Sequence, residues 1–341
     1  MTRSRQALFA AVTVIGMTGV LLVGLIAVDM ALHKRYEAMV GLNIRGYRGP
    51  VARRKRPGEQ RVVVLGGSTA FGYGVPWQES FPAVLERQLN ARRREQGRGP
   101  ISVVNLAYNS EGAYAFWFTL RDYAYLGYDA AIFYTGYNDL SPGNTYVFRQ
   151  TSPIFKLTGY LPILPMICRE KAMALRYGGN IEAGYRGEKT VFRPNLTQRA
   201  TASALEAAVR ISNSLDRQLG QISTRSEPIA EATTPTACGE PWTAYCRSVE
   251  RAVTLLLDRQ KRVLIVDQPD ITEAQADQQQ ALLAMLTERF SGNPAVQHMS
   301  LGKTVDVKDP SMAYDGMHLT AAGNERIAEA LIQPTLELLQ Q

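Results

Sequence analysis

Short apolar runs alternate with amphipathic stretches from Gln60 onward, and this alternation restricts the possible folds more than any other feature of the sequence. Arg61–Leu65 is a β-branched run that ends in a pair of glycines, as expected of a buried parallel strand. Further strands are predicted at Ile101–Leu106, Ala130–Tyr134, Arg262–Asp267 and Ala295–Leu301. Helices are predicted after a capping Ser80, over Ala113–Leu126, over Val249–Arg259 and from Thr320 to Leu331. The pattern predicts a three-layer α/β/α sandwich around a mostly parallel five-stranded sheet.

The N-terminal part contains an uncharged, mostly apolar run of 22 residues, Ala7–Val28. A helix of this length spans a hydrocarbon core of about 30 Å. A cleaved signal peptide is the alternative, but its apolar region is usually only about 7–15 residues and ends in a small-x-small cleavage site. The run is longer than that, and no clean cleavage site follows it. We therefore expect one retained transmembrane helix within residues 1–32.

A basic segment, residues 33–60, follows this helix. The predicted domain begins after it, at 61–341, and contains insertions at about 140–196 and 224–241. The segment is expected to be a solvated linker that contacts anionic lipid headgroups. Arg3 and Arg5 precede the helix, whereas Lys34 and Arg35 begin a longer series of positive charges after it. By charge alone, the positive-inside rule would place the domain in the cytoplasm.

The charge balance and the cysteines exclude several classes of protein. Lys and Arg number 38 against 31 Asp and Glu, a net charge of +7, and His33–Arg56 alone accounts for that excess. The rest of the chain is close to neutral, which argues against nucleic-acid binding. Three cysteines without a C-x-x-C spacing provide neither a disulfide scaffold nor a zinc site. Cys238 and Cys246 form a disulfide or remain free thiols, depending on the compartment.

Chemically competent side chains follow the first and third predicted strands and precede the last predicted helix. Ser68 stands in the segment G-G-S-T-A-F-G directly after the first strand, and Asn138 stands in G-Y-N-D after the third. Asp315 and His318 stand three residues apart in D-G-M-H. Ligands of open α/β sheets bind at the carboxyl ends of the strands, so we expect these side chains to meet there. Neither a P-loop nor a G-x-G-x-x-G dinucleotide pattern follows the first strand.

Together and in this order, the segments resemble the four sequence blocks of the SGNH hydrolases, the GDSL esterase/lipase superfamily. The resemblance spans about Arg61 to Leu331 and implies a flavodoxin-like sheet. It identifies Ser68 as the nucleophile, although Gly67 replaces the usual aspartate of G-D-S. Asn138 corresponds to the asparagine of G-x-N-D, and Asp315 with His318 to the D-x-x-H block. Gly112 is the best match to the glycine of the second block, at a spacing that departs from N-x-G-x-x-G.

The resemblance implies a serine esterase with a Ser68-His318-Asp315 triad, an acyl-enzyme, and no metal or organic cofactor. The oxyanion donors would be the amides of Ser68 and Gly112 and the side chain of Asn138. His33, beside the membrane helix, and His298, in a strand among apolar neighbours, are poor rivals as the base. Anchored relatives commonly act outside the cytoplasm, so the resemblance favours a single-pass protein with a periplasmic or extracytoplasmic domain.

The acyl group is less determined than the reaction. O-acetyl groups of an envelope glycan are the first expectation, and transfer of the acyl group to a sugar, as in an O-acyltransferase, is an alternative. The apolar segment Pro153–Ile167 raises a third possibility, a lipid ester, with the segment acting as a lid or lying on the membrane. A catalytically silent envelope scaffold is the alternative from a different class. The sequence does not predict an oligomeric state.

Overall fold

The computed structural model describes residues 3–39, 41–141, 143–176, 201, 237–302 and 304–340. The chain divides into two units, Met1–Ala38 with Ser152–Arg225 and Met39–Thr151 with Ser226–Gln341. The insertions expected at about 140–196 and 224–241 lie partly outside the described residues.

The second unit contains the predicted sheet, and all five predicted strands are confirmed within one or two residues. The sheet is parallel throughout, in the order β2-β1-β3-β4-β5. The three inner strands are almost fully buried, whereas the edge strand β5 is half-exposed. The strand bounds are β1 Gln60–Gly66, β2 Ile101–Asn105, β3 Ala130–Thr135, β4 Arg262–Asp267 and β5 Val296–Ser300.

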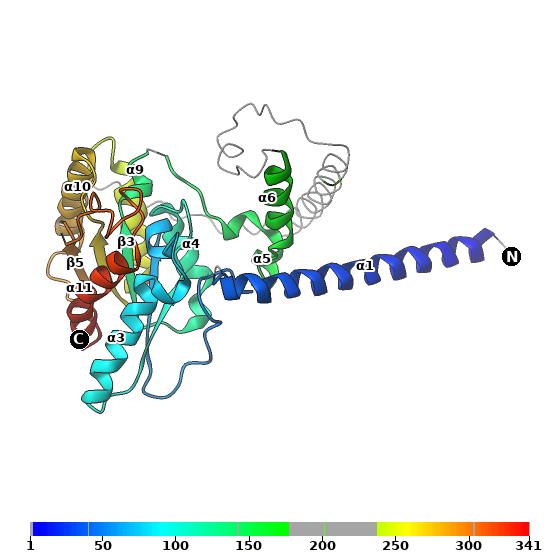
Figure 1. Ribbon diagram of the computed structural model, residues 1–341, viewed down its shortest axis with the longest axis horizontal. Coiled ribbons are helices and arrows are strands. Elements are labelled where there is room, and N and C mark those ends of the chain that lie inside the picture. The colour runs from blue at the N-terminus through cyan, green and yellow to red at the C-terminus, as the bar shows by residue number, and fades with distance from the viewer. Residues whose placement is uncertain are drawn as a thin grey trace. The chain divides into compact units, whose positions relative to one another are not determined.

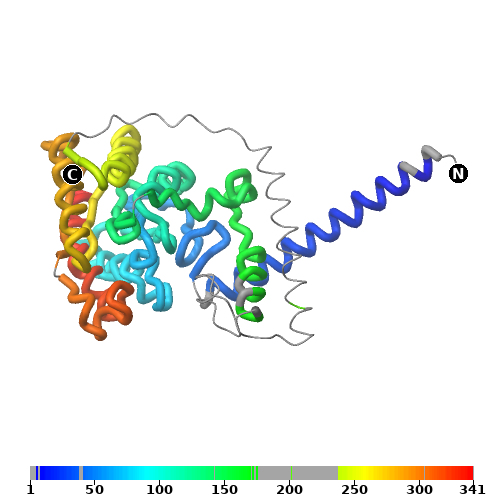
Figure 2. The backbone as a smooth tube through the Cα atoms, turned by 90° about the horizontal axis from the view of Figure 1, so that it is seen from above, coloured from blue at the N-terminus to red at the C-terminus, as the bar shows by residue number. Residues whose placement is uncertain are grey.

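Helices cover both faces of the sheet, as the alternation predicts. On one face α3 (Phe81–Glu95) packs against α11 (Ala321–Gln340), and the two views show them side by side (Figures 1 and 2). On the other face α4 (Tyr114–Asp122) packs against α9 (Thr243–Asp258), which also contacts α10 (Glu273–Phe290). The architecture is therefore the predicted three-layer α/β/α sandwich.

One helix was not predicted, and one predicted helix has a different cap. Helix α10 has no clear signal in the sequence, because its glutamine-rich first half hides the amphipathic pattern. Ser80 stands at the N-cap position of α3, but its hydroxyl donates to the Trp77 carbonyl rather than capping the helix. The first amide of α3, that of Phe81, donates instead to Asn324 Oδ1 of α11 at 2.8 Å. A partner more than two hundred residues away thus provides the cap.

The first unit contains α1 (Arg3–Met39), the only helix among the described residues that is apolar and long enough to cross a membrane. Its 37 residues span ~55 Å, more than a hydrocarbon core of about 30 Å. Near its C-terminal end, Asp29 accepts hydrogen bonds from the amides of Ile163 and Leu164. A carboxylate of α1 therefore caps α6 (Leu164–Arg176). Much of the apolar segment Pro153–Ile167 is helical: it contains α5 (Pro153–Thr158) and the first residues of α6.

The prediction of a solvated basic linker is wrong for residues 41–49. Leu42, Tyr47 and Arg48 are buried in the second unit. The Arg48 guanidinium donates hydrogen bonds to the carbonyls of Phe71, Gly72 and Val75, and it lies 4.4 Å from the centroid of the Phe71 ring. Because a buried cation must be satisfied by acceptors, this segment is held as part of the domain core.

Candidate active site

Ser68 is placed by a tight turn at the carboxyl end of β1. It is the first residue of the short helix α2 (Ser68–Phe71), which ends at Gly72 in the left-handed conformation (φ 80°). The Ser68 carbonyl accepts hydrogen bonds from the amides of Gly72 and Tyr73. Since the first amides of a helix have no intrahelical acceptor, the Ser68 amide is available to a ligand at the sheet edge.

Ser68, His318 and Asp315 form a continuous chain of hydrogen bonds across 250 residues of sequence. His318 Nε2 lies 2.8 Å from Ser68 Oγ, and His318 Nδ1 lies 2.6 Å from Asp315 Oδ2. The amide of His318 also donates to Asp315 Oδ1 at 2.7 Å. Burial raises the pKa of Asp315, but hydrogen bonds from the His318 amide and ring and from the Met317 amide outweigh it, so the pKa lies below its usual value. The carboxylate is thus ionised where it faces the imidazole.

Asn138 extends from the turn after β3 to the turn of Ser68. It belongs to the 3₁₀ turn Tyr137–Asp139, and its Nδ2 donates to the Glu111 carbonyl at 2.9 Å. A Cβ atom at Gly67 would lie only 1.9 Å from Asn138 Nδ2, so the amide packs directly against this glycine. An amide nitrogen carries two hydrogens, and Glu111 uses one of them. The other can be donated to a ligand.

This close approach explains why a glycine precedes the serine, and it predicts the effect of a side chain there. In Gly67→Ala the new methyl group should displace Asn138, and turnover should fall by about 10²–10³ with the fold retained, as for the loss of one oxyanion donor. Steady-state kinetics on a short-chain ester measures the effect, with circular dichroism as the fold control. Gly239→Ala is the matched control, because a Cβ at that exposed glycine meets nothing within 4 Å. Unchanged turnover in Gly67→Ala would contradict the placement of Asn138.

Gly112 is held in place by Asp139, the last residue of the G-Y-N-D segment. Both carboxylate oxygens of Asp139 accept from the Ala113 amide, at 3.1 and 3.0 Å. A Cβ at Gly112 would lie 2.4 Å from Asp139 Oδ1, so only glycine fits beside this carboxyl group. Among the described residues the Gly112 amide has no acceptor. Asp139 therefore positions the segment that carries the second backbone donor expected from the sequence.

Asp139 also makes the stability of the domain depend on pH. Burial raises its pKa from 3.8 to about 7, although the hydrogen bond from the Ala113 amide opposes the shift. Because the pKa of Asp139 is higher in the folded than in the unfolded state, protonation of Asp139 stabilises the fold, and this stabilisation is complete below the unfolded-state pKa. It is lost as the pH rises to the folded-state pKa of about 7. The free energy of unfolding should therefore fall more between pH 4 and pH 7 (roughly the two pKa values) in the wild type than in Asp139→Asn.

Urea denaturation at a series of pH values checks this expectation. Asn at position 139 keeps an oxygen acceptor for the Ala113 amide but does not titrate. Asp277→Asn, a change at an exposed position of α10, is the control and should retain the wild-type slope. The same pH dependence in Asp139→Asn would show that another group causes it.

Two buried side chains that the sequence analysis did not identify support the site. Gln268, which follows β4, donates to Thr69 Oγ1 at 2.5 Å and accepts from the Tyr137 amide at 2.7 Å. It thereby joins the turn of Ser68 to the turn of Asn138. Arg149 is fully buried, pairs with Glu111 at 3.3 Å and donates to the Leu106 carbonyl. The available signal for the first was a Gln directly after the predicted strand Arg262–Asp267, and nothing local identified the second.

The other two histidines lie in different surroundings. His298 was expected among apolar neighbours, but it lies on the half-exposed strand β5. Its Nε2 is 2.8 Å from Asp267 Oδ2. His33 lies inside α1, buried, with its Nε2 2.7 Å from the Leu161 carbonyl. Neither contacts Ser68. His318 is thus the histidine that reaches the serine, as the resemblance implies.

Two exposed tyrosine rings flank His318. The ring of Tyr73 lies 5.0 Å from the imidazole centroid, and the ring of Tyr314 stacks on it at 5.8 Å with an interplanar angle of 18°. Both rings are about half exposed, at 50% and 47%. A groove of about 590 Å³, lined by Tyr114, Phe118 and Tyr146 among others, includes Asn144, whose side chain donates to the carbonyls of Ser110 and Asn138. Aromatic surface is therefore available beside His318 and in the groove that contains Asn144.

Cys238 and Cys246 are joined in a disulfide, with the sulfur atoms 1.92 Å apart, whereas Cys168 is a buried free thiol. The disulfide links the start of α9 to the segment before it. Of the two alternatives for this pair, the structure has the bridged form.

Comparisons with known proteins find distant similarities in structure. No family model matches the chain, and no curated protein matches it. The psychrotrophic esterase EstA from Pseudoalteromonas is similar in structure, with 9% identity, a TM-score of 0.45, and coverage of 83% of this chain and 100% of that one. A GDSL-like lipase from Bacteroides thetaiotaomicron has 12% identity, a TM-score of 0.42, and coverage of 91% and 98%.

At these identities and TM-scores the likeness does not tell what the chain does. The chain's own structure is more specific, because the sheet order and the site geometry follow from its residues. One edge of the sheet brings together Ser68, Gly67 beside Asn138, and the hydrogen-bonded pair Asp315 and His318. The chain is therefore a parallel α/β/α sandwich that carries, at one edge of its sheet, the segments by which it resembles the SGNH hydrolases.

Proposed function

We propose that this protein is a membrane-anchored serine esterase of the SGNH type that hydrolyses a carboxylic ester. The observation that carries the proposal is the chain of short contacts from Ser68 Oγ through His318 to Asp315, at 2.8 and 2.6 Å. A serine hydroxyl is a poor nucleophile at neutral pH unless a base in hydrogen-bond contact takes its proton. This geometry provides that base and orients it.

In the proposed reaction, Ser68 Oγ attacks the acyl carbon while His318 Nε2 takes the serine proton. The tetrahedral intermediate then loses the alcohol, to which His318 returns the proton, and the acyl group stays on Ser68. A water molecule next gives a proton to His318 and adds to the acyl carbon, after which Ser68 leaves and recovers that proton. Asp315 holds the imidazole in the tautomer with hydrogen on Nδ1 and stabilises the imidazolium.

Three donors would stabilise the oxyanion: the amides of Ser68 and Gly112 and the side chain of Asn138. The proposal for Asn138 is supported by its contact with Gly67 and its fixed bond to Glu111. That for Gly112 is supported by the bond between Asp139 and the neighbouring Ala113 amide. Such donors act without reorganisation in the transition state, which is why each contributes strongly to the rate.

An O-acetyl ester of an envelope glycan is the substrate that we propose. The exposed rings of Tyr73 and Tyr314 beside His318 favour it, because the apolar faces of sugar rings pack well on aromatic side chains. Transfer of the acyl group to a sugar hydroxyl is the second candidate, since the same acyl-enzyme and the same aromatic surface would serve a sugar acceptor.

We further propose that the domain faces the periplasmic or extracytoplasmic side. The Cys238–Cys246 disulfide supports this orientation, because disulfides persist in oxidising compartments. Arg48, one of the positive charges that oppose this orientation, is buried in the domain instead of lying at the membrane surface. A topology reporter fused after residue 341 tests the orientation, and a cytoplasmic readout would refute it.

The test of the reaction uses the full chain in uncharged detergent with an O-acetylated oligosaccharide. Release of acetate into water supports the esterase, and appearance of the acetyl group on an added unacetylated sugar supports the transferase. Absence of both, together with no labelling by a fluorophosphonate probe, would favour a catalytically silent scaffold.

A further inference from the structure

A large groove in the described part of the second unit does not contain the candidate active site. It is a groove of about 860 Å³ along the outer edge of the sheet. Its walls are the edge strand β2, helix α3 and the segment Gly49–Arg56, which continues from the buried residues 41–49. None of Ser68, Gly112, Asn138, Asp315 or His318 lines it.

The edge of β2 is already closed to a further strand. Both the amide and the carbonyl of Ile101 are bonded to the side chain of Asn90, and the Val103 amide donates to Glu86 Oε2 at 2.6 Å. An exposed strand edge otherwise pairs with extended peptides. Because α3 side chains occupy these groups, a ligand of this groove must be recognised by the side chains that line it.

Those side chains make the groove positively charged. Its two carboxylates are engaged: Glu59 pairs with Arg61 and accepts from Ser102, and Glu86 accepts from Val103. The lining arginines include Arg53, Arg56, Arg87 and Arg94, all exposed.

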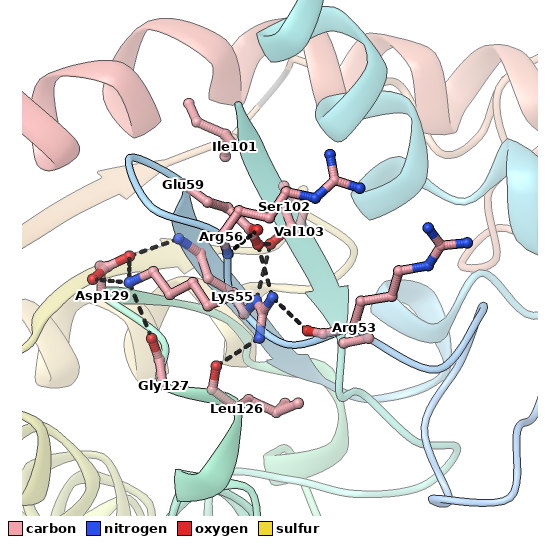
Figure 3. Close-up of polar contacts among 12 residues, drawn as sticks. Arg53, Lys55, Arg56, Glu59, Ile101, Ser102, Val103, Leu126, Gly127 and Asp129 are labelled. Atoms are coloured by element: carbon pink, nitrogen blue, oxygen red, sulfur yellow. Dashed lines mark hydrogen bonds and ion pairs between the residues drawn. The ribbon is translucent and has the colours of Figure 1, made fainter. Parts of the chain in front are cut away.

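Two of these arginines are free to bind a ligand. Figure 3 shows polar contacts at this segment, among them those of Lys55 with Asp129 and of the Arg56 amide with Glu59. The buried guanidinium of Arg61 donates to Glu59 and to the Leu126 carbonyl. In the part of the chain that the structure describes, no partner contacts the guanidinium group of Arg53 or Arg56. A pair of unoccupied guanidinium groups at one groove favours carboxylate or phosphate, which they bind through two parallel hydrogen bonds.

The groove also offers apolar and aromatic surface. Pro50, Val51, Trp77 and Pro100 line it together with the arginines. Trp77 is fixed in place, because Gly41 and Gly49 lie directly against its side chain. Flat apolar surface bordered by arginines suits a chain of sugar rings that carry carboxylates, since ring faces pack on the indole and prolines while the guanidinium groups bind the acid groups.

We propose that this groove binds a strand of an acidic, carboxylate-bearing polysaccharide. Charge complementarity selects this occupant over a neutral glycan, and the closed strand edge disfavours a peptide. The proposal does not depend on the ester chemistry, because its site shares no residue with the candidate active site.

The test measures binding of polygalacturonate to the full-length protein in uncharged detergent at moderate salt. In Arg53→Gln/Arg56→Gln we expect affinity to fall by about tenfold or more, since two charge-assisted contacts are lost. Both side chains are exposed, so the variant should fold, and thermal unfolding checks this. The matched control is Arg54→Gln/Arg92→Gln, which removes the same charge from exposed positions outside the groove and should change affinity less than about twofold.

Several outcomes would overturn the proposal. These are failure of the wild type to bind polygalacturonate, equal binding of neutral dextran, and equal loss of affinity in the two double variants. Binding of vesicles with anionic phospholipid but not of polygalacturonate would identify a lipid headgroup as the ligand instead. Esterase activity is not part of the readout, so failure here leaves the proposed reaction untouched.

Discussion

Ser68→Ala should lower ester turnover by a factor on the order of 10⁴–10⁶ while leaving the fold intact. Removing the hydroxyl takes away the atom that would carry the acyl group, and the oxyanion donors alone retain only a small part of the rate enhancement. The measurement is kcat/KM for a short-chain ester with the full chain in detergent. Ser248→Ala, at a half-buried serine of α9 whose hydroxyl donates to the Ala244 carbonyl, is the matched control and should behave as the wild type.

His318→Ala should cause a loss almost as large, because neither other histidine of the chain contacts Ser68. The double variant Ser68→Ala/His318→Ala should be no worse than the single variants, since the residues act as one unit. Additive losses would show that the two side chains act independently, and full activity of Ser68→Ala in a pure preparation would refute the serine mechanism.

Arg48→Met should destabilise the second unit by about 3 kcal/mol or more, because several buried carbonyls lose a charged donor. The carbonyls of Phe71, Gly72 and Val75 all lie just after Ser68, so the turn of Ser68 should loosen as well. Chemical denaturation measures the stability. Turnover below the denaturation midpoint should also fall, since Ser68 and His318 then meet less often in the productive geometry.

Arg54→Met is the control, because Arg54 is exposed and lies in the same segment. It should change the free energy of unfolding by less than about 0.5 kcal/mol. Equal stability of Arg48→Met and the wild type would mean that residues 41–49 are a linker after all. A chain that begins at Gln60, which lacks Arg48, should likewise fail to form a stable domain.

The sheet and the four segments of the site could be predicted from the sequence because their signals are local. Buried strands such as Arg262–Asp267 are continuous β-branched runs, and D-G-M-H brings Asp315 and His318 together within three residues of sequence. The distance from His318 to Ser68 then follows from the parallel sheet, which gathers the carboxyl ends of its strands at one edge.

What the sequence could not predict depends on partners far along the chain. Arg48 resembles its solvated neighbours in a basic run, and its burial depends on carbonyls more than twenty residues away. Arg149 forms an ion pair with Glu111 and a hydrogen bond to the Leu106 carbonyl. No sequence motif around these residues indicates that they pair. His298 was expected among apolar neighbours of its own strand, whereas β5 is a half-exposed edge strand and its partner Asp267 belongs to the neighbouring strand β4.

The most direct test of the proposed mechanism is the site of covalent modification. The purified full-length protein would be treated with a fluorophosphonate, digested, and analysed by mass spectrometry for the modified peptide. The mechanism predicts one adduct, on Ser68, that forms in the wild type and in the control Ser248→Ala but is lost in Ser68→Ala and strongly reduced in His318→Ala. A folded wild-type protein that carries no adduct, or carries it on another residue, would contradict the assignment of Ser68 as the nucleophile.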